Sequence, residues 1–226
     1  MIVLERLYNS YKMGGSAMTY TNSTDCWDSY LMYGERRFFK KKAVVYRENS
    51  DGEEGFYYLK KGLIKISTTI HTGEQSTIDI VCDEKPFGEQ TADGEVYFST
   101  ASAIEDSIVY FFPYENIVTV MGEDEKLRML MYNSLTEKLK VLSTNLLFHS
   151  FPSEKKLART ILILREKFAS ENIPFTQKEL SRYTDLNRIT IYNIFKKWEG
   201  NVVSIHKRKI KINNINNLKK IAAMSS

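Results

Sequence analysis

The chain has 226 residues, 42% of them hydrophobic, and a formal net charge of +4. This length and composition predict two compact domains and exclude a disordered chain. No run of about 18 apolar residues occurs, which argues against a membrane span. The apolar start at residues 2–4 is soon interrupted by charge, so we expect no secretory leader, a cytoplasmic protein and no membrane partner.

The charge is divided unevenly along the chain. Residues 151–226 contain 16 Lys and Arg against 6 Asp and Glu, whereas residues 1–150 contain 16 against 22. A basic C-terminal third joined to an acidic remainder indicates a module that binds a polyanion, because Lys and Arg displace counterions from phosphate backbones. The alternative is a basic surface that is only solvated.

Cysteine and histidine are too sparse for a metal or redox centre. Cys26 and Cys82 cannot form a disulfide framework, a zinc module or a four-cysteine iron–sulfur ligand set. His71 stands in a turn-like "HTGE" segment, and neither His149 nor His206 has cysteine or carboxylate neighbours at metal-ligand spacing. We therefore expect ordinary thiols, no metal and no bound cofactor.

The first half of the chain predicts an antiparallel β domain. Residues 2–11 have the pattern of an amphipathic helix, but residues 1–26 otherwise match no useful motif. Between residues 36 and 112, short runs rich in Val, Ile, Tyr and Phe alternate with Gly- and Asp-containing loops. The runs are "AVVY" (43–46), "GFYYLKKGLIKIS" (55–67), "STIDIVC" (76–82) and "SIVYFF" (107–112). Evenly spaced strands without crossover helices predict a sandwich or barrel.

After Pro113 the apolar spacing changes to three and four residues, which predicts a helix of about seven turns from Glu123 until Pro152 ends it. So long an apolar stripe favours a partner helix from a second copy, although packing on its own chain is the alternative. The residues that we expect at the dimer contact are Leu127, Met131, Leu135, Leu139, Leu142 and Leu146.

A helix that Ser153 can cap follows, and then two short helices joined by a tight turn. Thr176 and Glu179 have the spacing of a capping box, which places a helix from Gln177 to about Tyr183. Asn187 can cap the second helix. This arrangement predicts a helix-turn-helix, and the alternative is a purely structural helical domain.

The second helix of such a motif enters the major groove of DNA. Arg188 can engage guanine through two hydrogen bonds, and Ile189 can contact a thymine methyl group. Thr190 and Asn193 share this outward face and complete the expected base contacts.

Basic and polar residues around this motif predict contacts to the DNA backbone. Residues 201–213, "NVVSIHKRKIKIN", have the pattern of a hairpin with a basic tip, which would make the unit a winged helix. We also expect the backbone N–H of Thr176 to be available to a phosphate. The expected phosphate contacts are Thr176, Lys178, Asn187, Lys196, Lys197, Lys207 and Arg208.

Taken together, these segments resemble the Crp/Fnr family of bacterial transcription regulators over roughly residues 27–215. The motifs that carry the resemblance are "GFYYLKKGLIKI", "TGEQSTIDIV", "PFGEQ" and "FTQKELSRYTDLNRITIYNIFKKW". The resemblance implies an α+β protein with an N-terminal antiparallel, jelly-roll-like β-roll, a long dimerisation helix and a C-terminal winged helix-turn-helix. It divides the chain into residues 1–113, 114–150 and 151–226.

The resemblance also implies an effector pocket in the β-roll, at Gly88, Glu89, Phe98, Ser99 and Thr100. Cyclic-AMP-binding members carry an arginine in this cassette for the cyclic phosphate, but no arginine occurs here between Arg47 and Arg128. A buried phosphate without such a donor would be costly. The sequence therefore predicts a regulator that does not depend on cyclic AMP.

We expect a homodimeric, sequence-specific DNA-binding transcription regulator that acts on a pseudo-palindromic site and is not an enzyme. Its partners would be double-stranded DNA, RNA polymerase if it activates, and an unidentified small-molecule effector if one exists. Two alternatives are a cyclic-nucleotide-responsive regulator with an unconventional cassette and a protein-binding adaptor that uses the winged helix.

Overall fold

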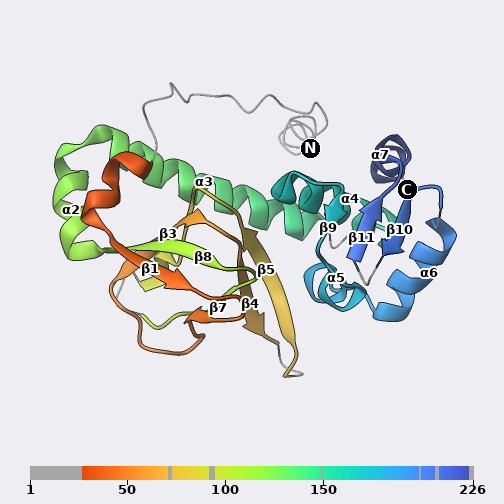
Figure 1. Cartoon of the computed structure of the whole chain (residues 1–226), viewed down its shortest axis with the longest axis horizontal. Helices are drawn as coiled ribbons and strands as arrows, with labels where there is room; N and C mark the ends of the chain where they lie inside the picture. The colour runs from red at the N-terminus through yellow and green to blue at the C-terminus, as the bar shows by residue number, and fades with distance from the viewer. Residues whose placement is uncertain are drawn as a thin grey trace.

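The computed structural model describes residues 27–70, 73–91, 95–148, 150–198, 200–206 and 209–223. Figure 1 shows a β-roll at one end, a smaller mixed domain at the other, and a long helix running beside the roll and joining the two. The expected α+β class is confirmed. The expected amphipathic helix at residues 2–11, Cys26, His71 and His149 lie outside the described residues.

The β-roll consists of two antiparallel four-stranded sheets, ordered β1-β8-β3-β6 and β2-β7-β4-β5. The strands are β1 (Glu35–Phe39), β2 (Val44–Tyr46), β3 (Gly55–Lys61), β4 (Ile64–Thr69), β5 (Gln75–Val81), β6 (Lys85–Phe87), β7 (Thr100–Ala103) and β8 (Ser107–Pro113). Two 3-10 helices, η1 (Trp27–Tyr33) and η2 (Glu89–Thr91), flank the strands. All four apolar runs form strands, whereas β1, β6 and β7 were not anticipated because they are short or polar.

Two helices, rather than a single one, follow the roll. α2 (Tyr114–Glu123) ends at Asp124, whose carboxylate accepts hydrogen bonds from the backbone N–H groups of Lys126 and Leu127 at 2.8 and 3.2 Å. These bonds satisfy the first donors of α3 (Glu125–Phe148). The predicted long helix is therefore confirmed, with its start moved to the residue after an aspartate cap.

The C-terminal domain packs four helices against a small three-stranded sheet ordered β10-β11-β9. Its elements are α4 (Ser153–Phe168), β9 (Asn172–Ile173), α5 (Gln177–Thr184), α6 (Arg188–Trp198), β10 (Val203–His206), β11 (Lys209–Ile212) and α7 (Ile215–Ala223). Ser153 is the first residue of α4 and makes no side-chain cap, so the expected capping role was wrong. The antiparallel pair β10 and β11 forms the expected wing.

The two domains share one hydrophobic cluster. Leu63 and Ile80 of the roll belong to the same buried cluster as Leu157, Phe175 and the rest of the C-terminal core. Polar contacts also cross the junction, since the ammonium of Lys167 lies 2.5 Å from the carboxylate of Asp79. The C-terminal domain is therefore docked on the β4–β5 side of the roll.

Candidate nucleic-acid interface and effector region

Local hydrogen bonds cap the N-termini of both helices of the helix-turn-helix. The hydroxyl of Thr176 accepts from the N–H of Glu179 at 3.2 Å, and the Thr176 N–H donates to the Glu179 carboxylate at 2.6 Å. Asp185 ends α5 with φ of 57°, in the left-handed region that aspartate tolerates better than most residues. Asn187 accepts from the N–H of Ile189 at 2.9 Å and caps α6, so the predicted capping residues are confirmed.

The helix α6 has one face in the core and one in solvent. Its buried side chains are Ile191, Ile194, Phe195 and Trp198. Arg188, Ile189 and Asn193 are exposed, whereas Thr190 is half-buried. Tyr192, which sequence reasoning missed, is 53% exposed on the same helix. Its position directly after the buried Ile191 is the signal that could have identified it, because adjacent helical residues point about 100° apart.

The expected phosphate contacts lie in different surroundings. Lys178, Asn187 and Lys196 are exposed, and Lys207 and Arg208 lie outside the described residues. Lys197 is exposed but its ammonium lies 2.8 Å from Glu154 of α4, which also accepts from the indole N–H of Trp198 at 2.7 Å. The expectation for Thr176 was wrong, because its backbone N–H is already bonded within the capping box.

Aromatic side chains fill the interior of the β-roll. The ring centroids of Tyr46 and Tyr97 are 4.0 Å apart in a stacked pair, and Tyr57 stacks on Phe87 at 5.3 Å. All four residues are buried. Burial is the largest cause that raises the pKa of the Tyr46 and Tyr57 phenols well above its usual value, so both stay neutral.

The residues expected to form an effector pocket differ in exposure and in hydrogen bonding. Phe98 is 66% exposed, and the buried hydroxyl of Ser99 accepts a hydrogen bond from Gln90 at 2.6 Å. The hydroxyl of Thr100 is bonded to the backbone N–H of Glu48 at 3.0 Å. Both hydroxyls therefore have partners within the chain, and the effector pocket expected at these residues stays a prediction.

The Gly88–Glu89 pair instead connects the roll to α3. Gly88 has φ of 77°, and a Cβ atom there would lie 2.9 Å from the rings of Tyr46 and Tyr57, so only glycine fits. The Glu89 carboxylate forms an ion pair with Lys138 and accepts from the hydroxyl of Ser134 at 3.3 Å. Glu89 therefore positions the long helix on the roll.

The other face of α3 is apolar, and its side chains are largely exposed. Leu135, Leu139, Leu142 and Leu146 are 46%, 62%, 48% and 72% exposed, and Tyr132 extends the same stripe. Leu127, by contrast, is fully buried in the cluster around Trp27 and Phe56, and Met131 packs against that cluster. The expectation that Leu127 contacts a partner was wrong, because the roll covers that side of the helix.

The described residues give no sign of a metal site or a membrane helix. Within the described ranges, no group of three His, Cys, Asp or Glu side chains could hold a metal ion. In the same ranges no helix is long and apolar enough to cross a membrane. Cys82 is a free thiol that donates to the carbonyl of Lys167 at 3.0 Å, and burial is the main cause that raises its pKa.

Comparisons with known proteins agree with this architecture. The model of the cyclic nucleotide-binding domain family matches residues 36–124. The chain is 23% identical over 189 residues to the global nitrogen regulator of Nostoc sp., a match that covers 77% of this chain and 83% of that protein. The protein of the same name from Synechocystis sp. is 24% identical over 191 residues, covering 78% and 83%.

Solved structures share the fold at low sequence identity. FixK2 from Bradyrhizobium japonicum superposes with a TM-score of 0.73 at 16% identity, covering 85% of this chain and 99% of that one. A CRP/FNR-family transcriptional regulator from Thermus thermophilus superposes with a TM-score of 0.74 at 18% identity, covering 85% and 100%. With its roll matched as a cyclic nucleotide-binding domain and its whole architecture shared with these regulators, the chain has the Crp/Fnr fold, and the resemblance inferred from its sequence motifs is confirmed.

Proposed function

We propose that the chain is a sequence-specific DNA-binding transcription regulator, that it acts as a homodimer, and that it does not require cyclic AMP. The outward face of α6 is the observation that carries this proposal. Arg188, Ile189 and Asn193 are exposed there, while the opposite face anchors the helix in its own core. A guanidinium at the start of such a helix suits guanine in the major groove.

The uncovered stripe of α3 supports the homodimer. Tyr132, Leu135, Leu139, Leu142 and Leu146 follow one another at steps of three and four residues. That spacing suits a coiled coil with a second copy of the same helix. Contiguous exposed apolar surface of this kind marks a protein–protein interface. Two copies would present two α6 helices to half-sites about one helical turn apart, on a pseudo-palindromic site.

The packed interior of the roll supports independence from cyclic AMP. Tyr46, Tyr57, Phe87 and Tyr97 occupy the centre of the roll, and no arginine lies between Arg47 and Arg128. A cyclic phosphate there would have neither room nor a cationic partner. If the regulator activates transcription, RNA polymerase is the further partner that we expect.

Selection of DNA from a pool of random duplexes tests the proposal directly. The full-length chain is incubated with the pool at physiological salt, without added ligand, and the bound duplexes are sequenced. We expect a two-fold-symmetric motif. A selection that yields no motif, even with cyclic AMP added, would contradict sequence-specific binding; a motif obtained only with cyclic AMP would contradict ligand independence.

The dimer is tested separately by Leu139→Glu, which places a charge in the exposed stripe of α3. We expect sedimentation equilibrium to show dimers for the wild type and at least a 100-fold weaker association for the variant, since a buried unpaired charge is strongly unfavourable. Asn133→Glu, on an exposed part of α3 outside the stripe, is the matched control. Equal weakening in both variants would contradict the assigned contact.

A protein-binding adaptor is the second candidate, because Ile189 and Tyr192 expose apolar surface on α6, at 69% and 53%. The salt dependence of complex formation distinguishes a DNA-binding regulator from a protein-binding adaptor. Binding to DNA through Lys and Arg weakens steeply as salt rises, whereas apolar contact with a protein does not.

A further inference from the structure

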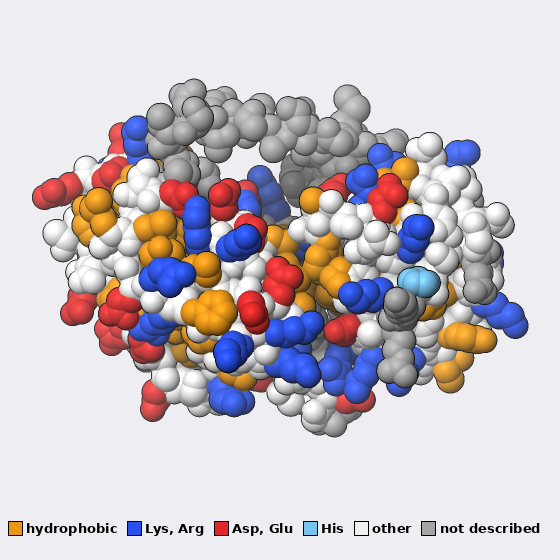
Figure 2. All heavy atoms as spheres, viewed as in Figure 1, with side chains coloured by type: hydrophobic (Ala, Val, Ile, Leu, Met, Phe, Trp, Pro, Cys, Tyr) orange, Lys and Arg blue, Asp and Glu red, His pale blue; other side chains and the backbone are white. Residues whose placement is uncertain are grey.

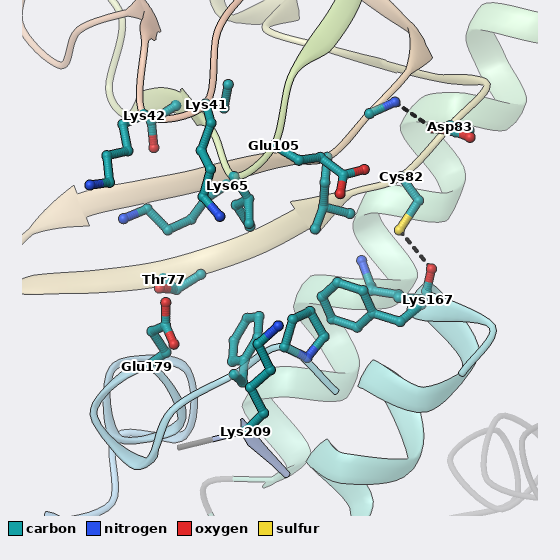
Figure 3. A pocket seen from close by; sticks show the side chains of 18 of the residues that line it. Lys41, Lys42, Lys65, Thr77, Cys82, Asp83, Glu105, Lys167, Glu179 and Lys209 are labelled. Atoms are coloured by element: carbon teal, nitrogen blue, oxygen red, sulfur yellow. Dashed lines mark hydrogen bonds between the residues drawn. The ribbon is translucent and has the colours of Figure 1, made fainter. Parts of the chain in front are cut away.

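A cavity of about 830 Å³ lies at the junction between the roll and the C-terminal domain. The roll contributes the loop before β2 and parts of β4 and β5, and the other wall comes from α4, α5 and β11. Figure 3 shows Lys41, Lys42 and Lys65 on the roll side of this space and Lys209 opposite them. The volume lies within the range of small-molecule sites in proteins, about 300–1,000 Å³.

Positive charge predominates on the walls of the cavity. Six of the lining residues are basic, namely Lys41, Lys42, Lys65, Lys167, Arg182 and Lys209. Three are acidic, namely Asp83, Glu105 and Glu179. Figure 2 shows blue side chains gathering where the two domains meet on the lower part of the visible face.

Most of these cations have no carboxylate partner among the described residues. Lys167 is paired with Asp79, but no described carboxylate lies within ion-pair distance of Lys41, Lys42, Lys65, Arg182 or Lys209. Asp83, one of the three acidic lining residues, accepts a hydrogen bond from the backbone N–H of Gly62 at 2.6 Å. The net charge of the walls is therefore available to a ligand.

The electrostatic environment of Lys65 points the same way. Burial is the largest cause that lowers the pKa of this half-buried ammonium, the positive charge of Arg182 lowers it further, and Glu179 acts in the opposite direction. An anion placed between Lys65 and Arg182 would relieve both unfavourable effects on the charged form.

We propose that this interdomain cavity binds a small molecule with at least two negative charges, supplied by phosphate or carboxylate groups. The cations from the roll and from the C-terminal domain can engage different charged groups of one ligand. Phe168, Pro174 and Phe175 give the same cavity an apolar side against which the body of the ligand can pack.

Binding across the junction has a direct consequence for the arrangement of the domains. Lys65 belongs to β4, whereas Arg182 and Lys209 belong to α5 and β11. A ligand held from both sides stabilises the docked arrangement by mass action, since it binds this arrangement better than separated domains. This places small-molecule sensing at the junction of the domains instead of in the interior of the roll.

Isothermal titration calorimetry of the full-length chain, without DNA, tests the site with two probes, inorganic pyrophosphate and citrate. We expect saturable binding of one anion per chain for at least one probe, and the tighter probe identifies phosphate or carboxylate as the preferred group. Lys65→Ala and Lys209→Ala should each weaken binding at least tenfold. Lys61→Ala, at an exposed lysine of β3 outside the cavity, should leave it unchanged.

Absence of saturable binding by both probes would overturn the proposal, as would equal weakening by Lys61→Ala. If Lys65→Ala and Lys209→Ala leave anion binding unchanged, the cations of the cavity do not hold the anion and the proposal also fails. The site does not rest on the proposed function, because the titration contains no DNA. Circular dichroism of each variant confirms that a loss of binding is not a loss of folding.

Discussion

The interior of the roll and the junction between the domains differ in packing and in charge. The interior is closed by stacked aromatic rings, such as Tyr46 on Tyr97 and Tyr57 on Phe87, and its tyrosines stay neutral. The junction contains a large cavity lined by basic side chains, and a few polar contacts cross it. A packed interior resists change, because each void or charge is costly, whereas the ion pair at the junction contributes little beside the apolar cluster that the two domains share.

The largest expected effect lies in the interior of the roll. Phe87 is 1% exposed, and Phe87→Ala should lower the free energy of unfolding by about 3–5 kcal/mol through lost burial and the cavity left behind. Urea unfolding followed by fluorescence measures this change. Phe98→Ala, at a residue of the same cassette that is 66% exposed, should stay within about 0.5 kcal/mol. Similar losses at both positions would contradict the contrast between a packed interior and an exposed cassette.

A smaller effect is expected at the start of α6, beside the junction. Arg188 lines a cavity of about 370 Å³ with Glu74 and Ser76 of the roll, and its side chain is exposed. Arg188→Ala should weaken binding to the selected DNA by about 1–3 kcal/mol and relax the preference for one base per half-site. Lys196→Ala should instead weaken binding to all duplexes similarly and reduce the salt dependence. Fluorescence anisotropy on selected and random duplexes separates the two, and a uniform loss for Arg188→Ala would contradict base reading.

The pH dependence of stability should reveal the contact that joins α4 to α6. Burial alone would raise the pKa of Glu154, but hydrogen bonds from Lys197 and Trp198 outweigh it, so the pKa is lower than usual. Because the folded pKa is depressed, the stabilisation is present above the unfolded pKa of about 4.5 and is lost as pH falls through the folded pKa. Glu154→Gln should lower the free energy of unfolding by about 1 kcal/mol at pH 7, a value that allows for the exposure of Lys197. Unfolding free energies of wild type and variant should converge towards pH 3, and a constant difference would contradict the assignment.

The smallest effect is expected from the ion pair between the domains. Asp79→Asn removes the charge that Lys167 meets at 2.5 Å, in a pair that is about one-fifth exposed. We expect the free energy of opening the junction to fall by about 0.2–1 kcal/mol, equivalent to a 1.4- to 5-fold faster hydrogen exchange through this opening. Hydrogen exchange of α5 amides measures this opening, and Asp51→Asn at an exposed loop position is the control. An unchanged exchange rate in Asp79→Asn would show that the apolar cluster alone holds the domains together.

Local chemistry made much of the C-terminal domain predictable. Thr176 and Glu179 form a capping box through bonds between each side chain and the backbone N–H of the other residue. The side chain of Asn187 caps α6 by accepting from the backbone N–H of Ile189. The outward positions of Arg188 and Asn193 follow from the buried Ile191 and the period of the helix. These features depend on residues a few positions apart, so the sequence carries them directly.

The effector region could not be predicted in the same way. Its expected residues stand close together in the sequence, but the folded roll buries Ser99 and exposes Phe98 one position earlier. The cavity at the junction is lined by residues as far apart as Lys41 and Lys209, and no spacing in the sequence relates them.

The sequence by itself determined the apolar strands β2, β3, β4, β5 and β8 of the roll, the long helix and the helix-turn-helix, because each depends on periodicity and caps within short segments. Only the tertiary structure decided which side of α3 is free. Counting back from Leu135, a step of four residues reaches Met131 and a step of three reaches Tyr132. Which of these two residues continues the exposed stripe depends on where the roll packs. With the roll covering Leu127 and Met131, the stripe through Tyr132 and Leu139 is left exposed, since burial depends on contacts between distant segments.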